Sequence, residues 1–395
     1  MISLSPNPPR GHMLKSHCRR RAGMTLVELL VVVAIVGLLA VTVLPNVATT
    51  TENRRSREAA RVTSSFFAKA QSRAIGRPEW AGVAVIPTNA NVLYSIDLFQ
   101  ANVPQVYRGE SYESKAFIAG ANELSRDLGF YDDPLSKALV TIPESRKVAT
   151  GDLIRFGGSG PWYEFVKGSP YSVRFRGSLG GSASANEMVG QTARNTPWPA
   201  QSMSSSSPQD VAHGFEILRQ PVRNGSAFTI PDGRCVDLAW SGYGSSTYIR
   251  FVTAGTPVTV PAVTVLFDAT GRVRQIFTQD ASGSNRVTVT GPVYFLVGRV
   301  DRAGNDPTLA STYDGTDDTK GFNWQYGDSY WIVIDPASGI VKTAECAKRE
   351  DLNGNGTIDP GEDVNRNGLL DDVVNTPDVV VSQAFARSES PVGGR

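Results

Sequence analysis

A long apolar run near the N-terminus constrains the fold of this 395-residue chain more than any other feature. The run extends from Met24 to Leu44, and Glu28 is its only charged side chain. A helix needs about 20 apolar residues to cross a bilayer, so we predict a hydrophobic transmembrane and assembly helix over 24–45. A charged group deep in a bilayer costs about 2.5–3.5 kcal/mol. Glu28 therefore needs a partner that offsets its charge.

The residues around the run indicate its orientation and its retention. Lys15, Arg19, Arg20 and Arg21 precede it, which predicts a cytoplasmic N-terminus and a translocated remainder. A secretory signal peptide would have a shorter apolar region followed by a small-residue cleavage site. The sequence LPNVATTTENRR that follows offers a poor site of that kind. We therefore expect a single-pass inner-membrane protein with a periplasmic head.

The sequence AGMTLVELLVVVAIVGLLA resembles the prepilin-type N-terminus of type IV pilins and type II secretion pseudopilins. Gly23 stands before the cleavage point, the hydrophobic Met24 follows it, and Glu28 comes four residues later. Gly37 and Pro45 fall where family members have helix-loosening residues. The resemblance implies that prepilin peptidase removes a basic leader, residues 1–23, and methylates the new N-terminus. A plain signal anchor is the alternative.

The same resemblance implies a partner for the carboxylate. Glu28 would pair with the ammonium group on Met24 of a neighbouring subunit in the assembled filament. A buried charge is tolerated once it is paired, and removing one partner is strongly unfavourable. The alternative is a Glu28 at the level of the lipid headgroups with no partner. The implied partners are other pilin or pseudopilin subunits, prepilin peptidase, the assembly platform of the inner membrane and the lipid bilayer.

The stretch after the apolar run continues the helical pattern, and we predict an amphipathic helix over 46–76. Gly76 and Pro78 then provide a stop. The arginines of this stretch lie mostly on another face, for which we favour solvent over lipid phosphates. The apolar stripe consists of Ala59, Val62, Phe66 and Ala70, with Ala60, Thr63, Phe67 and Ala74 beside it.

Short β-like runs separated by Gly, Pro, Asn and Ser follow residue 76. FDATGRVRQIF predicts a hairpin that turns at Thr270 and Gly271, and IDPASGIVKTA predicts one at Ser338 and Gly339. We therefore expect an α+β fold, in which the long N-terminal helix packs on an antiparallel β-sheet head over 77–346. The candidate strands cover residues 81–87, 92–99, 171–175, 214–218, 226–231, 234–240, 263–268, 272–277, 293–298 and 330–335.

Two stretches of the head give a narrower resemblance. FFAKAQSRAIGRPEWAGVAV followed later by FDATGRVRQIF resembles the H-type minor pseudopilins of type II secretion, and YWIVIDPASGIVKTAE is similar to the final hairpin of many pseudopilins. Between the matching parts, about 178–213 is rich in Gly, Ser, Pro and Gln. We expect a flexible insertion there.

Composition limits the other chemistry of the chain. Lys and Arg number 39 and Asp and Glu number 38, so no overall charge attracts nucleic acid, and we expect no nucleic-acid partner. The chain has 3 Cys and 3 His, too few for a His-rich metal site, and we expect no enzyme. Outside the leader, Cys235 and Cys346 could form one disulfide in an exported domain or remain two free buried thiols.

An acidic segment, 347–375, matches an EF-hand-like calcium loop. The spacing of oxygen-bearing side chains, with Gly356 at the sixth place, suits Ca²⁺. A second, weaker loop overlaps its end, and a flexible tail is expected over 376–395. A solvated Asn-Gly-Asp linker is the alternative. The expected ligands are Asp351, Asn353, Asn355, Thr357, Asp359 and Glu362 in the first loop, and Asp363, Asn365, Asn367, Leu369 and Asp371 in the second.

Three functions remain open at this point. The resemblance favours a structural subunit, a minor pseudopilin of a type II secretion pseudopilus. The second is a type IV pilin of a surface fibre for adhesion, motility or DNA uptake. The third, from another class, is a membrane-anchored calcium-dependent binding protein.

Overall fold

The computed structural model combines one long helix with antiparallel sheets, which confirms the α+β fold expected from the sequence. The chain divides into two compact units, Met1–Thr51 and Glu52–Arg395. The structure describes residues 26–77, 79–89, 92–119, 125–132, 138–160, 162–174, 212–231, 233–244, 248–252, 260–280, 283–303, 321–346, 357–360 and 379–388.

Helix α1 covers Leu26–Ala74. In the second unit one stripe of it is buried, and the spacing of three and four residues in this stripe is that of a helical face. The helix is followed by Gly76 in the left-handed region, at φ +74°, which agrees with the predicted stop. Val62 and Phe66, expected on the stripe, are only half-buried at its margin. The fully buried members are Ser56, Ala59, Ala60, Thr63, Phe67, Ala70 and Ala74.

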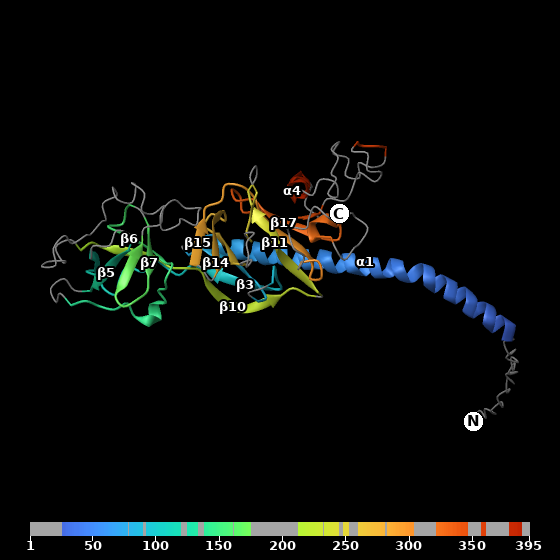
Figure 1. Cartoon of the computed structure of the whole chain (residues 1–395), viewed down its shortest axis with the longest axis horizontal. Coiled ribbons are helices and arrows are strands. Elements are labelled where there is room, and N and C mark those ends of the chain that lie inside the picture. Colours follow the sequence, from blue (N-terminus) through green and yellow to red (C-terminus); the bar gives the residue numbers. More distant parts are fainter. Residues whose placement is uncertain are drawn as a thin grey trace, which may run out of the picture. The chain divides into compact units, whose positions relative to one another are not determined.

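Two antiparallel sheets pack with this stripe (Figure 1). The first has the order β10-β3-β1-β13-β14-β15, and the second has the order β12-β11-β16-β17-β18, with β2 paired to β11. Both predicted hairpins are confirmed, as β13–β14 and as β17–β18. The strand bounds are β1 Ala81–Ile86, β2 Tyr94–Ser95, β3 Asp97–Asn102, β10 Val222–Thr229, β11 Arg234–Tyr243, β12 Ile249–Arg250, β13 Ala262–Phe267, β14 Val273–Asp280, β15 Gly283–Val287, β16 Val293–Arg299, β17 Tyr330–Ile334 and β18 Val341–Glu345.

The helix and the two sheets share one hydrophobic core. Phe67 of α1 is fully buried, and its ring centroid lies 5.0 Å from that of Phe295 on β16. Phe66 stacks on Phe228 of β10 at 5.5 Å. The core continues through apolar side chains of both sheets, among them Val83, Val85, Val263, Val265, Leu238 and Ile332.

A third sheet is folded into a small barrel with a core of its own. Its order is β4-β5-β8-β7-β6-β9. Two further antiparallel bridges, Tyr107 to Ile217 and Ala116 to His213, join the segment around β4 to the segment around β9 and close the sheet. The strands, labelled in part in Figure 1, are β4 Lys115–Ala119, β5 Ser125–Tyr131, β6 Leu153–Phe156, β7 Tyr163–Val166, β8 Tyr171–Arg174 and β9 Phe215–Leu218.

The barrel is inserted between two neighbouring strands of the first sheet. Asn102 at the end of β3 pairs with Val222 at the start of β10, so the chain leaves and re-enters the sheet at one place. The inserted part is 103–221, not only the stretch around 178–213 expected from composition; residues 175–211 lie outside the described part. The sequence analysis did not identify strands β4 to β7, of which β4, β6 and β7 have only four or five residues.

A second helix corrects the tail expected over 376–395. Helix α4 covers Val379–Ser388, within the segment for which the sequence had predicted a flexible tail. Val379, Ser382 and Ala386 are buried at helical spacing against sheet β12-β11-β16-β17-β18, on the face opposite the α1 core. The run of three valines at its start favours a strand by propensity alone, and packing against buried tryptophans outweighs that preference.

We predict that the barrel can be removed without unfolding the core. Replacing residues 103–221 by an Asn-Gly turn would join Asn102 to Val222 as a hairpin. Among the residues that the structure describes, hydrogen bonds from Ser284 Oγ to the carbonyl of Gly151 and from the guanidinium of Arg286 to the carbonyl of Leu218 join β15 to the barrel. Urea unfolding of the shortened chain should therefore give a free energy within about 2 kcal/mol of that of the full chain's core. A shortened chain that does not fold would show that the barrel is part of the core.

Candidate functional site

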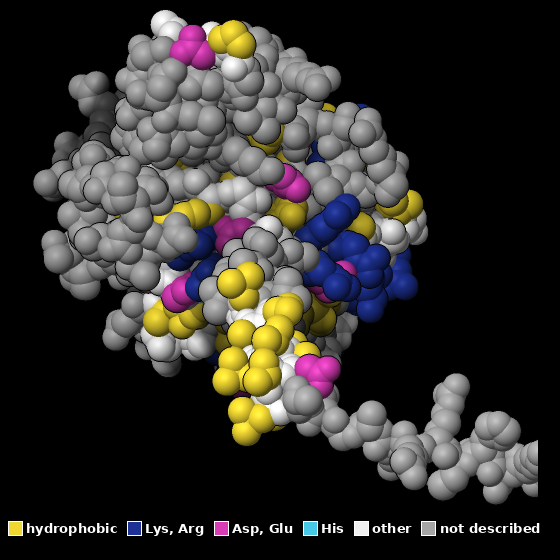
Figure 2. All heavy atoms as spheres, turned by 90° about the vertical axis from the view of Figure 1, so that its right-hand side faces the viewer, with side chains coloured by type: hydrophobic (Ala, Val, Ile, Leu, Met, Phe, Trp, Pro, Cys, Tyr) yellow, Lys and Arg dark blue, Asp and Glu magenta, His cyan; other side chains and the backbone are white. Residues whose placement is uncertain are grey.

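The N-terminal part of α1 presents a continuous apolar surface. Its large aliphatic side chains between Leu26 and Leu38 are exposed all round the helix, from 45% at Val32 to 79% at Leu26. Figure 2 shows these hydrophobic side chains gathered on the end of the helix that faces the viewer. Large exposed apolar surfaces mark sites of protein or membrane contact. This surface requires lipid or other apolar helices to cover it.

Glu28 lies in the first turn of α1 and is exposed among these apolar side chains. A carboxylate near a helix N-terminus interacts favourably with the helix dipole, typically by about 0.3–1 kcal/mol. Gly23 and Met24 lie outside the described residues. The cleavage point and the pairing of Glu28 with the new N-terminus therefore stay predictions.

The two helix-loosening residues do not interrupt the helix. Helix α1 is continuous from Leu26 to Ala74, across Gly37 and Pro45. No neighbouring atom lies within 4 Å of a Cβ built on Gly37, so packing within the chain does not require a glycine there. A proline removes a single backbone donor, and the remaining hydrogen bonds of a long helix can hold the flanking turns.

Among the residues that the structure describes, no helix is apolar over a length sufficient to cross a membrane. The span over 24–45 stays a prediction.

The basic residues at the start of the second unit are exposed, away from the buried stripe, and their contact with solvent rather than lipid phosphates stays a prediction. The side chains of Arg54, Arg55, Arg57 and Arg61 are exposed. Figure 2 shows a cluster of Lys and Arg side chains, in dark blue, on the face turned toward the viewer. Two of these arginines form salt bridges with glutamates three residues earlier in the helix: Arg55 with Glu52 at 2.9 Å, and Arg61 with Glu58 at 3.2 Å.

A buried arginine, which the sequence analysis missed, fixes this part of α1 to the head. Arg234 at the start of β11 is only 3% exposed. Its guanidinium donates to Ser56 Oγ at 2.8 Å and also to the carboxylate of Glu52. The hydrogen bond from Arg234 lowers the pKa of Glu52, against the opposing effect of burial. An arginine at the first position of a strand gives no sequence signal for such a contact.

Two buried carboxyl groups serve the fold. Burial raises the pKa of Asp237 to about 7, although the amide of Asn323 donates to it at 3.0 Å. Burial also raises the pKa of Asp152 to about 6, and backbone N–H groups of Ala149 and Gln220 donate to this side chain. Both groups therefore hold backbone segments together at loops and irregular pairings.

The expected calcium ligands lie mostly outside the described residues. Of the first loop only Thr357, which is exposed, and Asp359, which is half-buried, are described; none of the second loop is. Within the described ranges no three His, Cys, Asp or Glu side chains gather into a group that could hold a metal. The calcium segment therefore remains a prediction from the sequence.

The two cysteines of the head are free and buried, so the disulfide alternative is not formed. Cys235 lies on β11 and Cys346 directly follows β18, with β16 and β17 between these strands. Three strand spacings separate them, about 14 Å, whereas bonded cysteines have Cα atoms about 4.4–6.8 Å apart. Burial raises the pKa of both thiols well above the usual range.

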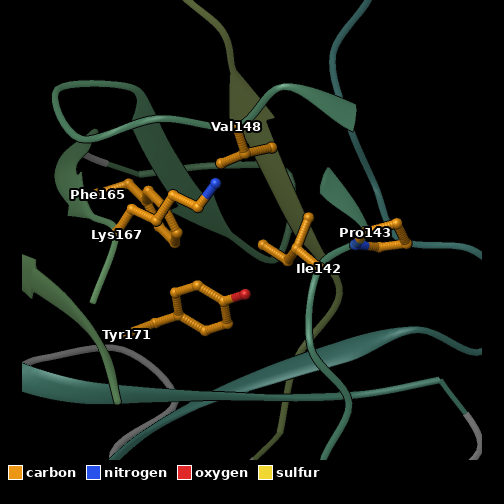
Figure 3. A pocket seen from close by; sticks show the side chains of 6 residues that line it. All are labelled: Ile142, Pro143, Val148, Phe165, Lys167 and Tyr171. Carbon is orange, nitrogen blue, oxygen red and sulfur yellow. The ribbon is translucent and has the colours of Figure 1, made fainter. Parts of the chain in front are cut away.

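One small hollow lies on the barrel (Figure 3). It encloses about 0 Å³ of space for a water-sized molecule, whereas typical ligand sites have ~300–1,000 Å³. The ammonium of Lys167 and the hydroxyl of Tyr171 point into it, between Ile142 and Phe165. Because Lys167 pairs with Glu144 at 2.8 Å, this hollow offers no free acid-base pair for catalysis.

Comparison with known proteins gives one match. Residues 18–44 match the family model described as the prokaryotic N-terminal methylation motif. No curated protein and no solved structure matches the chain. The motif implies processing by prepilin peptidase and assembly with other pilin-type subunits, and the proteins that carry it are structural rather than catalytic. The N-terminal segment of this chain is therefore that of a type IV pilin-like prepilin.

Proposed function

We propose that this protein is a minor pseudopilin, a structural subunit of a type II secretion pseudopilus. Before assembly it spans the inner membrane once, with the N-terminus in the cytoplasm and the head in the periplasm. Prepilin peptidase removes residues 1–23 and methylates Met24, and an assembly platform then moves the subunit into the filament. The observation that carries the proposal is the exposed apolar surface of α1 with Glu28 in its first turn, inside the matched methylation motif.

The architecture of the head supports a minor rather than a major subunit. A major subunit must repeat along the filament, so bulky additions to every copy would crowd its neighbours. Here a complete barrel, 103–221, is added to the core between β3 and β10. Such an addition suits a subunit present in few copies, near an end of the filament.

A type IV pilin of a surface fibre remains the second candidate, because the methylation motif is common to both classes. Copy number separates the two candidates. Fibres sheared from the cell surface should contain this chain in small amounts if it is a minor pseudopilin. A chain that dominates such fibres would be a major pilin.

The direct test of processing is the mature N-terminus. We expect mass spectrometry of the full chain, co-expressed with a prepilin peptidase, to show cleavage between Gly23 and Met24 and methylation of Met24. Without the peptidase the leader should remain. A Gly23→Leu variant is the matched control and should stay uncleaved in both cases. A chain that is unprocessed with active peptidase, or cut at another place, would overturn the proposal.

We further propose that the segment 347–375 binds Ca²⁺ through the carboxylate, amide and carbonyl oxygens of its first loop, at about 10⁻⁴–10⁻³ M as in other extracellular modules. The bound ion would offset the repulsion among the acidic side chains and order this segment.

Limited proteolysis tests the calcium proposal. Residues 350–375 should resist protease in millimolar calcium and become sensitive when a chelator removes the ion. The variant Asp351→Ala should be sensitive in both conditions, whereas Asp301→Ala, which changes an acid outside the segment, should behave as the unmodified chain does. Protease resistance that chelation leaves unchanged would contradict the proposal.

A further inference from the structure

The stretch of α1 that enters the head first has no apolar side chain. It covers residues 52–58 and reads ENRRSRE, and within it only Ser56 is buried. The helix belongs to the hydrophobic core of the head from Ala59 onward. Packing of an apolar face supplies most of the stability of a helix in a protein. This stretch therefore needs polar contacts to stay on the head.

One buried arginine supplies such contacts. Arg234, at the first position of β11, donates from Nε to Ser56 Oγ at 2.8 Å. One of its terminal nitrogens donates to the carboxylate of Glu52 and, at 3.2 Å, to the carbonyl oxygen of the same residue. The guanidinium is planar and holds its donors in a rigid fork, so one side chain contacts two residues about one helical turn apart. We call this contact of Arg234 with Glu52 and Ser56 the arginine clasp.

Two other arginines act on Glu52, and neither joins the helix to the sheet. Arg55 pairs with Glu52 at 2.9 Å, but both residues belong to α1. Arg299 lies opposite Arg234 in the pairing of β11 with β16, and its Nε donates to Asp301 at 3.0 Å instead. Arg234 is therefore the arginine that connects this carboxylate to the head.

The clasp lies at the boundary between the two compact units of the chain. The first unit ends at Thr51 and the second begins at Glu52, so the clasp belongs wholly to the second unit. It holds the first turn of α1 in that unit on β11. An association that must order a flexible joint loses free energy, and a joint that is already ordered avoids this loss. The held turn therefore favours contacts of the apolar residues 26–38 with neighbouring molecules.

We propose that Arg234 is a positioning residue for assembly, which holds residues 52–56 on the head so that the apolar helix continues from a fixed base. This inference rests on the proposed function, because the neighbours that cover the apolar surface are those of a filament. They are other pilin-type subunits, so no second copy of this chain is needed. Since the clasp precedes the first core residue of the helix, Ala59, its loss frees the turn without unfolding the head.

The first test measures the held turn in the full chain, solubilised in detergent micelles. Glu52→Ala removes the carboxylate, and Glu58→Ala is the matched control, because Glu58 pairs with Arg61 of the same helix. Alanine is the best helix former, so lower helix propensity cannot loosen either variant. Amide hydrogen exchange across residues 52–58 should be at least about tenfold faster in Glu52→Ala, as expected for the loss of a charged hydrogen bond. Exchange across 63–74 should stay unchanged, and Glu58→Ala should exchange as the unmodified chain does.

The second test measures the amount of each variant in purified filaments relative to the amount in the membrane. This ratio should fall about tenfold in Glu52→Ala, because free energy lost at the joint is lost from association, and it should stay unchanged in Glu58→Ala. A residue with a merely structural role would lower the amount in both places and leave the ratio unchanged.

The outcomes separate this inference from the proposed function. Unchanged exchange in Glu52→Ala, or equal acceleration in both variants, would overturn the clasp. Faster exchange with a normal filament ratio would overturn the positioning role. Absence of the unmodified chain from filaments would overturn the proposed function and the positioning role with it, while the exchange rates would still decide whether the clasp holds the turn.

Discussion

Replacing Glu28 by leucine is expected to leave cleavage after Gly23 intact and to remove this protein from assembled filaments. Glu28 is exposed in the first turn of α1, within an apolar surface that another molecule must cover. Once covered, an unpaired carboxylate would be strongly unfavourable, by about 3–5 kcal/mol for a broken buried pair. The proposed partner is the methylated ammonium of Met24 on a neighbouring subunit. Leucine removes the attraction that sets the register between these helices.

The measurement is the amount of this chain in purified filaments relative to the amount in the membrane. Val27→Leu is the matched control, because it changes a neighbouring exposed side chain without a charge, and it should assemble normally. Glu28→Gln should fail as leucine does, since it keeps the shape and loses the charge. Normal incorporation of Glu28→Leu would show that no such ion pair forms, and the assembly proposal would lose its physical basis.

Local sequence patterns predicted several elements of the structure. Apolar periodicity predicted the long helix, and turn residues predicted its end near Gly76 and the two late hairpins. Each of these features is local, because neighbouring residues carry enough of the pattern to define it. The motif around Glu28 was likewise readable, since it is a short contiguous stretch.

Features that depend on contacts between residues distant in the chain could not be predicted from local sequence patterns. The barrel closes through bridges such as Ala116 to His213, which join residues far apart in the chain. Helix α4 forms where valines favour a strand, because the tryptophan face of the sheet selects a helical partner. The Arg234 contact with Ser56 and Glu52 likewise joins residues that no local pattern connects.

The two halves of α1 therefore carry different tasks. Residues 26–38 present exposed apolar surface, for which we propose a role in assembly, and the buried side chains between Ala59 and Ala74 belong to the core shared by two sheets. A substitution among these buried side chains should affect assembly only through the stability of the head. The next prediction tests this distinction with Phe67, a core residue that is distant in sequence from the proposed assembly surface.

Phe67→Ala is expected to destabilise the head by about 3–5 kcal/mol, the usual cost of removing a buried phenylalanine. Phe67 has no exposed surface, and it stacks on Phe295 between the helix and the second sheet. Domains of this kind have a total stability of about 5–15 kcal/mol, so the loss is a large share of the whole. Urea unfolding of the full chain, followed by the fluorescence of the buried tryptophans, measures the change.

Phe66→Ala is the matched control, since it makes the same change one position along the same helix. Phe66 is only half-buried, so part of its surface is already in water, and its loss should cost less than that of Phe67. In cells, Phe67→Ala should lower the amount of mature protein while leaving the N-terminus of each surviving molecule correctly cleaved, because an unstable head is degraded rather than misprocessed. Equal free energies of unfolding for the two variants would mean that the helix does not supply the shared core of the two sheets.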